Sequence, residues 1–506
     1  MITIDGSSLS IDDVVRVARK KEKVSICEDN RILVDQSAAL VDAHINKNRA
    51  VYGITTGFGH FARVSIPREH IRELQKNLLM SHSTGTGPFI RDDQVRAMML
   101  LRLNALIKGY SGIRWSTLER LLFMLNQDIL PQVPQKGSVG ASGDLVPLAH
   151  MSSPLIGLGK VKHNNKIREA EDLLNELGLS PLVLEAKEGL ALINGTQMMS
   201  AVGCLNIYDS DILCKTADIA SACSIEALRG TDSPFDPKVH ELRPHPGQRK
   251  VAENIKRLLK NSGILASHKQ CEKIQDAYSL RCIPQVHGAT RDALEYSGKV
   301  LLTEINSVTD NPLLFPETGE TISCGNFHGQ PLALALDFLG IAVSELADIS
   351  ERRIERLVDP SLSHLPPFLT EEGGLNSGYM ITQYAAAALV SENKILSHPA
   401  SVDSIPTSAN QEDHVSMGTI SAFKCSEIIK NVRSVLAIEL MCAAQGLDFI
   451  RLKPGDGVQE AYRTIRNLVP TLTQDRVMAY DLEKTVDLIS EDTLIRTVEA
   501  KTGPLH

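Results

Sequence analysis

The sequence predicts a mainly α-helical protein whose centre is a large bundle of long helices. Long stretches without proline carry apolar residues at steps of three and four, most clearly between residues 331 and 358. Strand signals are short and weak, as at residues 2–4 and 160–161. The chain has 506 residues, of which 43% are hydrophobic, so it can bury a sizeable core. Helices of this length need partners along their whole surface, which predicts a bundle shared between copies of the chain.

The pattern of apolar residues divides the chain into a mixed, mostly helical region of residues 1–188 and a region of residues 189–506 with the longest helices. In the first region a glycine-punctuated loop at residues 52–59 interrupts the apolar periodicity. Glycine and proline at residues 81–88 stop the helix before them. Residues 160–187 are more polar, which predicts a segment that lies outside the core. The helices expected here span residues 14–20, 37–47, 68–81, 92–108 and 115–128.

The stretch from Gly137 to His150, Gly-Ser-Val-Gly-Ala-Ser-Gly-Asp-Leu-Val-Pro-Leu-Ala-His, has an unusual chemical possibility. Its glycines allow the chain to bend tightly. If the amide nitrogen of Gly143 is pressed against the carbonyl carbon of Ala141, a five-membered ring can close. Loss of two waters, one of them from the Ser142 side chain, then leaves an exocyclic methylidene on an imidazolone. Gly143 suits this chemistry because it has no side chain to block the attack.

The same stretch also has a simpler interpretation. Most Gly-Ala-Ser-Gly stretches are turns, and an aspartate before an apolar run, here Asp144, is a helix-start signal. Ser142 would then be an ordinary turn residue. The tripeptide alone leaves both interpretations open, and both predict a helix that begins near Asp144.

The second region predicts five long helices. The first contains no proline and reads as one helix, bent at Gly195 or Gly203. Pro331 fits the first turn of the third helix, because a helix start leaves its backbone N–H unbonded in any case. The five helices are expected at residues 191–228, 286–309, 331–358, 378–397 and 411–445.

Polar clusters lie where these helices are expected to begin. Asn194 is either a capping residue or a hydrogen-bond partner for an imidazolone oxygen. Arg281 follows Gln275 and Tyr278 closely; an arginine binds a carboxylate through two parallel hydrogen bonds, although surface ion pairs are commoner. Phe327 is a packing ring or a shield against water. Helix N-termini carry partial positive charge, so several starts that converge would stabilise negative charge at one place.

The last expected helix begins with Gln411, Glu412, Asp413 and His414, three of which are metal-ligand types. Adjacent side chains on a helix diverge, however, and the sequence contains no His-Glu-x-x-His motif. We therefore expect no metal site.

Charge and cysteine content narrow the class of protein. The net charge of −8, the pI of about 6.0 and the lack of a long basic run argue against nucleic-acid binding. Nine scattered cysteines, with no Cys-x-x-Cys pair, predict reduced thiols and a cytoplasmic protein. The N-terminus does not resemble a signal peptide, and no stretch is apolar enough for long enough to span a membrane. We expect a small-molecule partner, and neither nucleic acid nor membrane.

The string at residues 137–150 resembles the signature of the aromatic amino acid ammonia-lyases and aminomutases, and the likeness runs from about Tyr52 to at least Met417. This family carries the methylidene-imidazolone group. The resemblance implies that the Ala-Ser-Gly tripeptide forms this group autocatalytically, with no external cofactor. It also implies a homotetramer of mostly helical subunits, with the long helices at its core, the prosthetic group in the smaller N-terminal region, and each active site assembled from three chains.

Matching motifs imply roles for individual residues. Tyr52 would be the catalytic base, Arg281 would bind the substrate carboxylate, and His82 and Glu412 would contact an imidazole. A tyrosine with a pKa of about 10 is a poor base at neutral pH, so we expect nearby positive charge or helix N-termini to lower it. The expected catalytic residues are Tyr52, Ala141, Ser142, Gly143, Tyr278 and Glu412. Substrate binding is expected from His82, Asn194, Arg281 and Gln411, and support of the prosthetic group from Asn194, Gln275 and Phe327.

The pair Ser81-His82 and the carboxylate of Glu412 resemble the histidine-specific members of the family. Tyrosine lyases tend to have His-Leu at the positions of Ser81 and His82. Phenylalanine lyases tend to have Phe-Leu there and usually carry glutamine at the position of Glu412. The expected reaction is the non-oxidative deamination of L-histidine to trans-urocanate and ammonia, the first step of histidine degradation. Cys324 stands where the family commonly has glycine, a departure that touches no proposed catalytic atom.

Other functions stay open. A tyrosine or phenylalanine ammonia-lyase, or an aromatic amino acid 2,3-aminomutase, would use the same electrophile. A fumarase-like lyase would need a Gly-Ser-Ser-x-Met-Pro-x-Lys-x-Asn loop, which the sequence lacks. A non-catalytic helical scaffold would have no reason to keep Tyr52, Arg281 and Glu412 alongside Ala-Ser-Gly.

Overall fold

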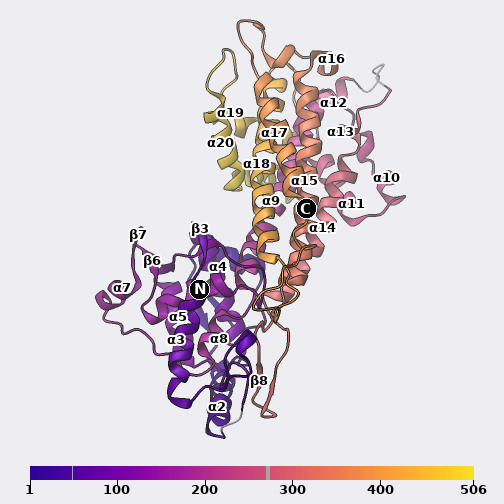
Figure 1. The fold of residues 1–506 in the computed structure, drawn as a ribbon. Coiled ribbons are helices and arrows are strands. Elements are labelled where there is room, and N and C mark those ends of the chain that lie inside the picture. Colours follow the sequence, from indigo (N-terminus) through magenta and orange to yellow (C-terminus); the bar gives the residue numbers. More distant parts are fainter. Residues whose placement is uncertain (48–49, 269–273) are drawn as a thin grey trace. The chain divides into compact units, whose positions relative to one another are not determined.

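The computed structural model describes residues 1–47, 50–268 and 274–506 (Figure 1). Its residues group into two compact units, and each unit is made of three separate segments of the chain. The first unit comprises Met1–Tyr208, Gly298–Leu336 and Pro399–Phe423, and the second comprises Asp209–Ser297, Asp337–His398 and Lys424–His506. This division by contacts has no boundary near residue 188. The two domains expected from the sequence, residues 1–188 and 189–506, remain a prediction.

The described residues are mainly helical, which confirms the predicted fold class. Four long helices contribute residues to both units: α9 (Gln197–Ala227), α14 (Ile283–Glu304), α15 (Gln330–Val358) and α18 (Gly418–Asp448). The second unit also contains α10 (Pro237–Glu241), α11 (Pro246–Leu258), α12 (Gly263–Ser267), α13 (Tyr278–Arg281), α16 (Pro360–Ser363), α17 (Met380–Leu396), α19 (Asp456–Arg466), α20 (Met478–Ser490) and α21 (Thr493–Thr502). The stripe predicted on α15 is fully buried at Leu332, Leu336, Leu339, Val343 and Leu346.

The first unit contains shorter helices and four small sheets. Its helices are α1 (Ile11–Arg19), α2 (Arg31–Asn46), α3 (Ile71–His82), α4 (Asp92–Leu106), α5 (Trp115–Asn126), α6 (Leu145–Ser152), α7 (Ala170–Glu176) and α8 (Glu188–Ile193). Parallel β1 (Ile2–Ile4) and β2 (Val24–Ile26) form one sheet, and antiparallel β3 (Thr86–Phe89) and β5 (Pro134–Lys136) form another. The other two are antiparallel, made by β4 (Leu130–Pro131), β6 (Lys160–His163) and β7 (Lys166–Glu169), and by β8 (Leu313–Phe315) and β9 (Glu320–Ile322).

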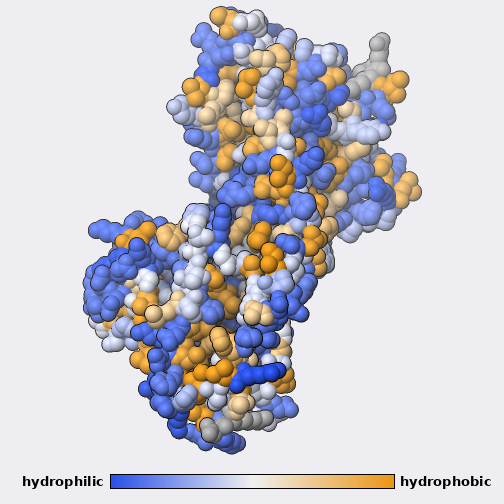
Figure 2. Space-filling model, in the orientation of Figure 1, coloured by the Kyte–Doolittle hydropathy of each residue, from blue (hydrophilic) through white to orange (hydrophobic). Residues whose placement is uncertain are grey.

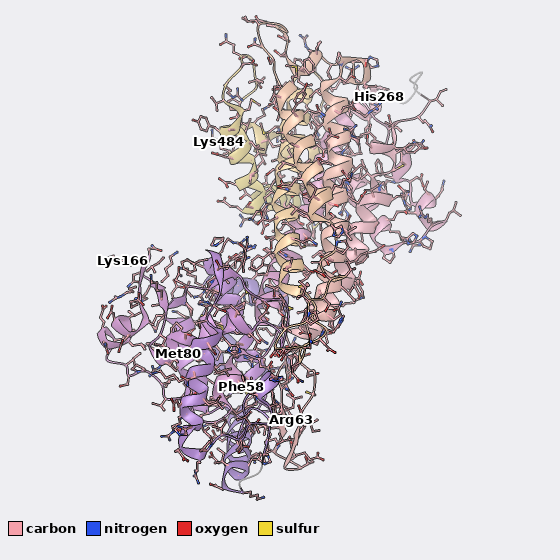
Figure 3. The ribbon with its side chains drawn as sticks, in the orientation of Figure 1. Phe58, Arg63, Met80, Lys166, His268 and Lys484 are labelled. Atoms are coloured by element: carbon pink, nitrogen blue, oxygen red, sulfur yellow. The ribbon has the colours of Figure 1, made fainter. Side chains whose placement is uncertain are left out.

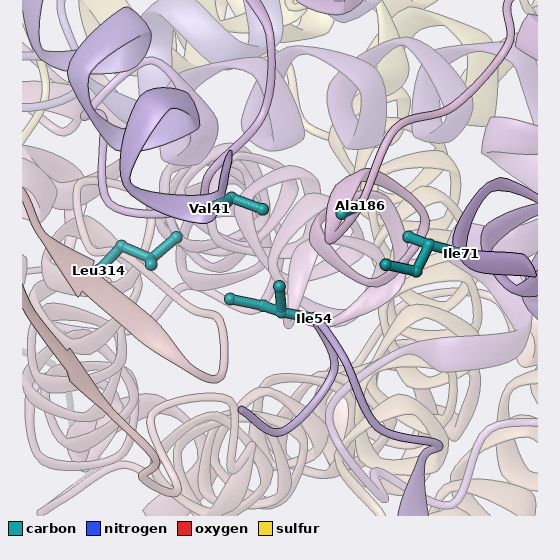
Figure 4. Packing of buried hydrophobic residues seen from close by; sticks show 5 residues of the cluster. All are labelled: Val41, Ile54, Ile71, Ala186 and Leu314. Carbon is teal, nitrogen blue, oxygen red and sulfur yellow. The ribbon is translucent and has the colours of Figure 1, made fainter. Parts of the chain in front are cut away.

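A buried apolar cluster fixes the glycine-punctuated loop at residues 52–59. Ile54 of this loop is fully buried and packs with Val41, Ile71, Ala186 and Leu314 (Figure 4). Burial of one side chain this size stabilises the packed arrangement by about 1.5–3 kcal/mol. The glycine-punctuated loop therefore has an apolar anchor two residues after Tyr52.

Several predicted helix boundaries are wrong, and three of them are wrong for a tertiary reason. The helix expected at 37–47 is α2, which begins at Arg31. The helix expected at 191–228 is split into α8 and α9, because Asn194 adopts an extended backbone conformation and the carbonyl of Gly195 accepts a hydrogen bond from the N–H of Asp144 instead of one within a helix. The helix expected at 286–309 ends at Glu304, and Thr309 accepts a hydrogen bond from Arg102 instead. The helix expected from Gln411 begins at Gly418, since the backbone of Met417 adopts positive φ and its N–H donates to Val139.

The cysteines within the described ranges are all free. Cys204, Cys214, Cys223, Cys425 and Cys442 are buried, as expected for unreactive core thiols, whereas Cys27, Cys282 and Cys324 are half-buried. Cys271 lies outside the described residues. None of the helices in those ranges is both long and apolar enough to cross a membrane.

Candidate active site

A cavity of about 690 Å³ in the first unit brings together five of the residues predicted from the sequence. Its wall is formed by the loop carrying Phe58, by α3, by the turn at 137–146, by α8 and by residues 407–412. Figure 3 labels Phe58 on the loop and Met80 on α3. The predicted residues that line the cavity are Tyr52, His82, Ala141, Ser142 and Glu412.

The Ala-Ser-Gly tripeptide occupies a tight turn at the edge of this cavity. The N–H of Gly143 lies 3.4 Å from the carbonyl oxygen of Gly140, so Ala141 and Ser142 form the corner. Ser142 has φ of 50°, a left-handed conformation that costs a residue with a side chain about 1–3 kcal/mol. A Cβ at Gly143 would lie 2.0 Å from the oxygen of Gly195. Strain and close packing therefore coincide at the tripeptide.

Asp144 holds this turn against two long helices. The side chain is fully buried, and its Oδ2 accepts a hydrogen bond from the N–H of Met199 at 2.9 Å, in the first turn of α9. Its Oδ1 accepts from the hydroxyl of Thr419 on α18 at 2.6 Å. The expected helix does begin beside Asp144, but the aspartate caps α9 rather than its own helix α6. Burial raises the pKa of Asp144 to about 6.

Tyr52 enters the cavity from the anchored loop. Its hydroxyl oxygen accepts a hydrogen bond from the N–H of Gly59 at 3.3 Å, and its ring packs edge-on against Phe58. Burial raises the pKa of Tyr52, the N–H of Gly59 partly offsets this, and the negative charge of Glu412 raises it further. The expected lowering of this pKa is therefore not provided by the first unit.

His82 and Glu412 provide polar groups to the wall of the same cavity. Burial lowers the pKa of His82, so the ring is neutral at pH 7, and its Nδ1 lies 3.0 Å from the hydroxyl of Ser81. The Oε2 of Glu412 is buried and has no hydrogen-bond partner among the described residues. An unpartnered carboxylate oxygen is costly to bury, which marks it as a group that awaits a donor. Gln411 is exposed and does not line the cavity.

Asn194 and Phe327 belong to the first unit but do not line this cavity. The Nδ2 of Asn194 donates to the carboxylate of Asp310 and the carbonyl of Asn311, and its Oδ1 is buried without a partner. Both partners are acceptors, so the amide orientation is fixed with Oδ1 as its free atom. Phe327 is half-buried in the loop before α15.

The three remaining predicted residues belong to the second unit. Gln275 and Arg281 line a cavity of about 590 Å³ there, and the guanidinium of Arg281 stacks 4.3 Å from the ring centre of the exposed Tyr278. The Nε of Arg281 and the Oε1 of Gln285 are buried without partners among the described residues. This cavity therefore has free donor and acceptor groups of its own.

Buried charges behind the tripeptide were missed by sequence reasoning. Lys187 and Asp310 form a fully buried ion pair at 2.8 Å, and the buried guanidinium of Arg102 donates to Gln197 and to the carbonyls of Thr309 and Ala191. Arg102, a lone charge within the apolar stretch of residues 97–107, was the available signal, but its partners are distant in sequence. Across the described ranges, no three His, Cys, Asp or Glu side chains form a group that could hold a metal ion.

The chain is similar to known proteins along nearly its whole length. The family described as "Aromatic amino acid lyase" matches residues 9–467. The histidine ammonia-lyase of Alkaliphilus oremlandii is 55% identical over 499 residues, which is 98% of each chain. The crystal structure of histidine ammonia-lyase from Trypanosoma cruzi has a TM-score of 0.92 and 43% identity, covering 99% of this chain and 95% of that one. The crystal structure of tyrosine aminomutase from Streptomyces globisporus has a TM-score of 0.95 and 39% identity, covering 100% of both.

Proposed function

Because this chain belongs to the aromatic amino acid lyase family, we propose that it removes ammonia from L-histidine and releases trans-urocanate. The family and the mainly helical fold confirm the resemblance noted in the sequence, and they make the protein a carbon–nitrogen lyase. The observation that carries the choice of substrate is the buried, unpartnered Oε2 of Glu412 in the cavity of Tyr52 and His82. A carboxylate without a donor suits the N–H of an imidazole, whereas phenylalanine offers no donor and tyrosine offers a single O–H.

We propose that Ala141-Ser142-Gly143 forms the methylidene-imidazolone. The residues fit this group: the corner of the turn is strained at Ser142, and the space beside Gly143 excludes any side chain. The group supplies an electrophilic carbon that makes the substrate's amine a better leaving group. Asp144, Met199 and Thr419 hold the turn in place, because the aspartate bonds to both long helices at once.

The chain's own side chains then position the substrate and remove its β-proton. Glu412 and His82 would bind the imidazole, and Tyr52 would take the proton. Since burial and Glu412 raise the pKa of Tyr52, a positive charge has to approach it in the assembled site. Arg281, matched by motif to the carboxylate-binding residue, belongs to the second unit and lines a different cavity. We therefore propose, as the family resemblance implies, that another chain supplies Arg281 in a homotetramer with shared active sites.

A substrate panel tests the assignment. Purified enzyme should release ammonia from L-histidine faster than from L-tyrosine or L-phenylalanine, with urocanate absorbance rising in step. Glu412→Gln should lower kcat/KM for histidine about 10- to 100-fold, because a charge-assisted hydrogen bond contributes about 1.5–3 kcal/mol. Asp413→Asn, one residue away on an exposed side chain, is the matched control. Faster turnover of tyrosine or phenylalanine would contradict the assignment.

An aminomutase is the second candidate, because the tyrosine aminomutase structure matches this chain as well as the lyase structure does. Such an enzyme returns the amine to the β-carbon. Product analysis separates the two: a lyase yields urocanate and free ammonia in equal amounts, whereas an aminomutase yields a β-amino acid and no net ammonia. The higher identity to a histidine ammonia-lyase favours the lyase.

A further inference from the structure

We propose that the cavity binds the substrate ring as an imidazolium, because Ser81 fixes His82 in the tautomer that accepts a hydrogen bond. The inference rests on the proposed function and adds to it the protonation state of the substrate. Ser81 is a positioning residue in this account, since it acts through His82 and does not itself need to contact the ring.

The tautomer follows from a short chain of hydrogen bonds at the end of α3. The hydroxyl of Ser81 lies 3.2 Å from the carbonyl oxygen of Leu78 and 3.0 Å from the Nδ1 of His82. A carbonyl can only accept, so the single hydrogen of Ser81 goes to Leu78, and the serine oxygen is left to accept from Nδ1–H. The carbonyl of Leu78 also favours the protonated form of the His82 ring, as an acceptor near Nδ1 would. Carbonyls in the last turn of a helix attract such donors.

A neutral ring with its hydrogen on Nδ1 presents Nε2 as a lone pair. Burial lowers the pKa of His82, so the neutral form prevails at pH 7. Across the described residues, Nε2 has no recorded hydrogen-bond partner, and His82 lines the same cavity as Glu412. The Oε2 of Glu412 is the second acceptor without a donor. The cavity thus offers the substrate ring two acceptors.

The charge of the cavity wall also favours binding of an imidazolium. Tyr52, His82 and Glu412 are the titratable groups on its wall, from the anchored loop, from α3 and from residues 407–412. No lysine or arginine lines it within the described ranges. With Tyr52 and His82 neutral, Glu412 leaves the wall with a net negative charge. Such a wall stabilises a cation.

The two protonation states of imidazole differ in what they offer. Neutral imidazole has one N–H donor and one lone pair, so one protein acceptor would face the lone pair. Imidazolium has two donors and satisfies both His82 and Glu412. The cavity should bind imidazolium about 10- to 100-fold more tightly than neutral imidazole, which is the usual effect of a charge-assisted hydrogen bond.

A bound cation would also help the reaction. A protonated ring withdraws electrons from the attached β-carbon and makes its hydrogen more acidic. Its positive charge would oppose the effect of Glu412 on Tyr52 and lower the pKa of the phenol. The ring keeps its own proton throughout, while Tyr52 removes a proton from the β-carbon.

Inhibition by two unreactive ligands tests the inference. 3-(Imidazol-4-yl)propanoate lacks the amine and cannot be deaminated, and its 2-fluoroimidazole analogue has the same shape but a ring too weakly basic to be protonated at neutral pH. Inhibition constants are measured from about pH 6 to pH 9. The imidazole ligand should lose affinity by about tenfold per pH unit above its ring pKa, whereas the fluorinated ligand should bind more weakly and show no pH dependence. Equal, pH-independent constants for both ligands would overturn the inference.

Variants separate the inference from its premise. Ser81→Ala frees the His82 tautomer and should flatten the pH dependence, whereas Ser81→Thr should restore it. Ser83→Ala is the matched control, because that hydroxyl bonds to the carbonyl of Leu79 at the same helix end without touching His82. Urocanate formation from L-histidine is followed in parallel. If no urocanate forms at any pH, the proposed function fails; if it forms while both inhibition constants stay flat with pH, only the imidazolium inference fails.

Discussion

Gly143 shows how packing selects a residue that the chemistry also requires. A Cβ at this position would lie 2.0 Å from the carbonyl oxygen of Gly195, and φ is 78°. The same oxygen accepts a hydrogen bond from the N–H of Asp144 at 2.6 Å, so the two chain segments are held in direct backbone contact. Absence of a side chain at Gly143 therefore keeps the turn closed as well as leaving its nitrogen open to reaction.

We expect Gly143→Ala to be destabilised by about 1–3 kcal/mol through overpacking alone and to retain its full unmodified mass. Gly178→Ala is the matched control, because Gly178 also has positive φ, 68°, but nothing within 4 Å of its Cβ. Urea unfolding and intact-mass measurement report the two effects. Equal losses of stability in both variants would show that the clash with Gly195 is unimportant.

The residues that line the cavity could largely be predicted, because each belongs to a local motif. Their supports could not. Asp144 bonds to Thr419, 275 residues away, and Lys187 pairs with Asp310, 123 residues away. No local pattern encodes such partners. The amide of Asn194 illustrates the limit: its place near the helix start was expected, but the use of its N–H groups by Asp310 depends on the fold.

At the scale of helices, sequence periodicity predicted the ends of a helix correctly only where no tertiary contact competed with helical hydrogen bonds at those ends. The helices predicted at 92–108 and 331–358 appear as α4 and α15 with ends shifted by no more than a few residues. The helix predicted from Gln411 starts later because its first residues make a backbone contact to the turn that holds the Ala-Ser-Gly tripeptide, through Met417 and Val139. Helix propensity is worth only a few tenths of a kcal/mol per residue, so such contacts override it.

The start of α19 provides a pH-dependent test of buried charge. Both carboxylate oxygens of Glu226 accept from the N–H of Gly455 at 2.9 Å, and burial raises the pKa of Glu226 from 4.5 to about 7. A raised pKa in the folded state means that stability is fully present below about pH 4.5 and falls as the pH rises through about 7.

Glu226→Gln keeps an acceptor and removes the charge. The variant should match wild type near pH 4.5 and exceed it by up to about 3 kcal/mol in free energy of unfolding near pH 8. Glu483→Gln, exposed on α20, is the control. Urea denaturation across this range measures the difference, and a gap between variant and wild type that does not change with pH would refute the explanation.

At the scale of the whole molecule, the groups expected at one active site are divided between the two units. Tyr52, His82 and Glu412 line one cavity and Arg281 lines another. Hydrophobic residues also reach the surface over the bundle helices on the face shown in Figure 2. Phe338 on α15 and Tyr384 and Ile395 on α17 are 46%, 61% and 74% exposed. Exposed apolar surface of this kind supports association between copies.

Shared active sites predict complementation between inactive chains. Tyr52→Phe and Arg281→Ala should each be inactive alone, and co-expression should restore up to about a quarter of wild-type activity by random mixing in a symmetric oligomer. Mixed oligomers would contain some sites with an intact Tyr52 from one chain and an intact Arg281 from another. Co-expressed chains that form mixed oligomers but stay inactive would show that a single chain supplies both residues.

The most direct measurement is the intact mass of the purified, active chain beside that of Ser142→Ala. We expect a wild-type chain that is lighter than its sequence by two waters and produces urocanate from L-histidine. For Ser142→Ala we expect a chain of full mass with almost no activity. A wild-type chain of full mass that still deaminates histidine would contradict the claim that Ala141-Ser142-Gly143 forms the electrophile.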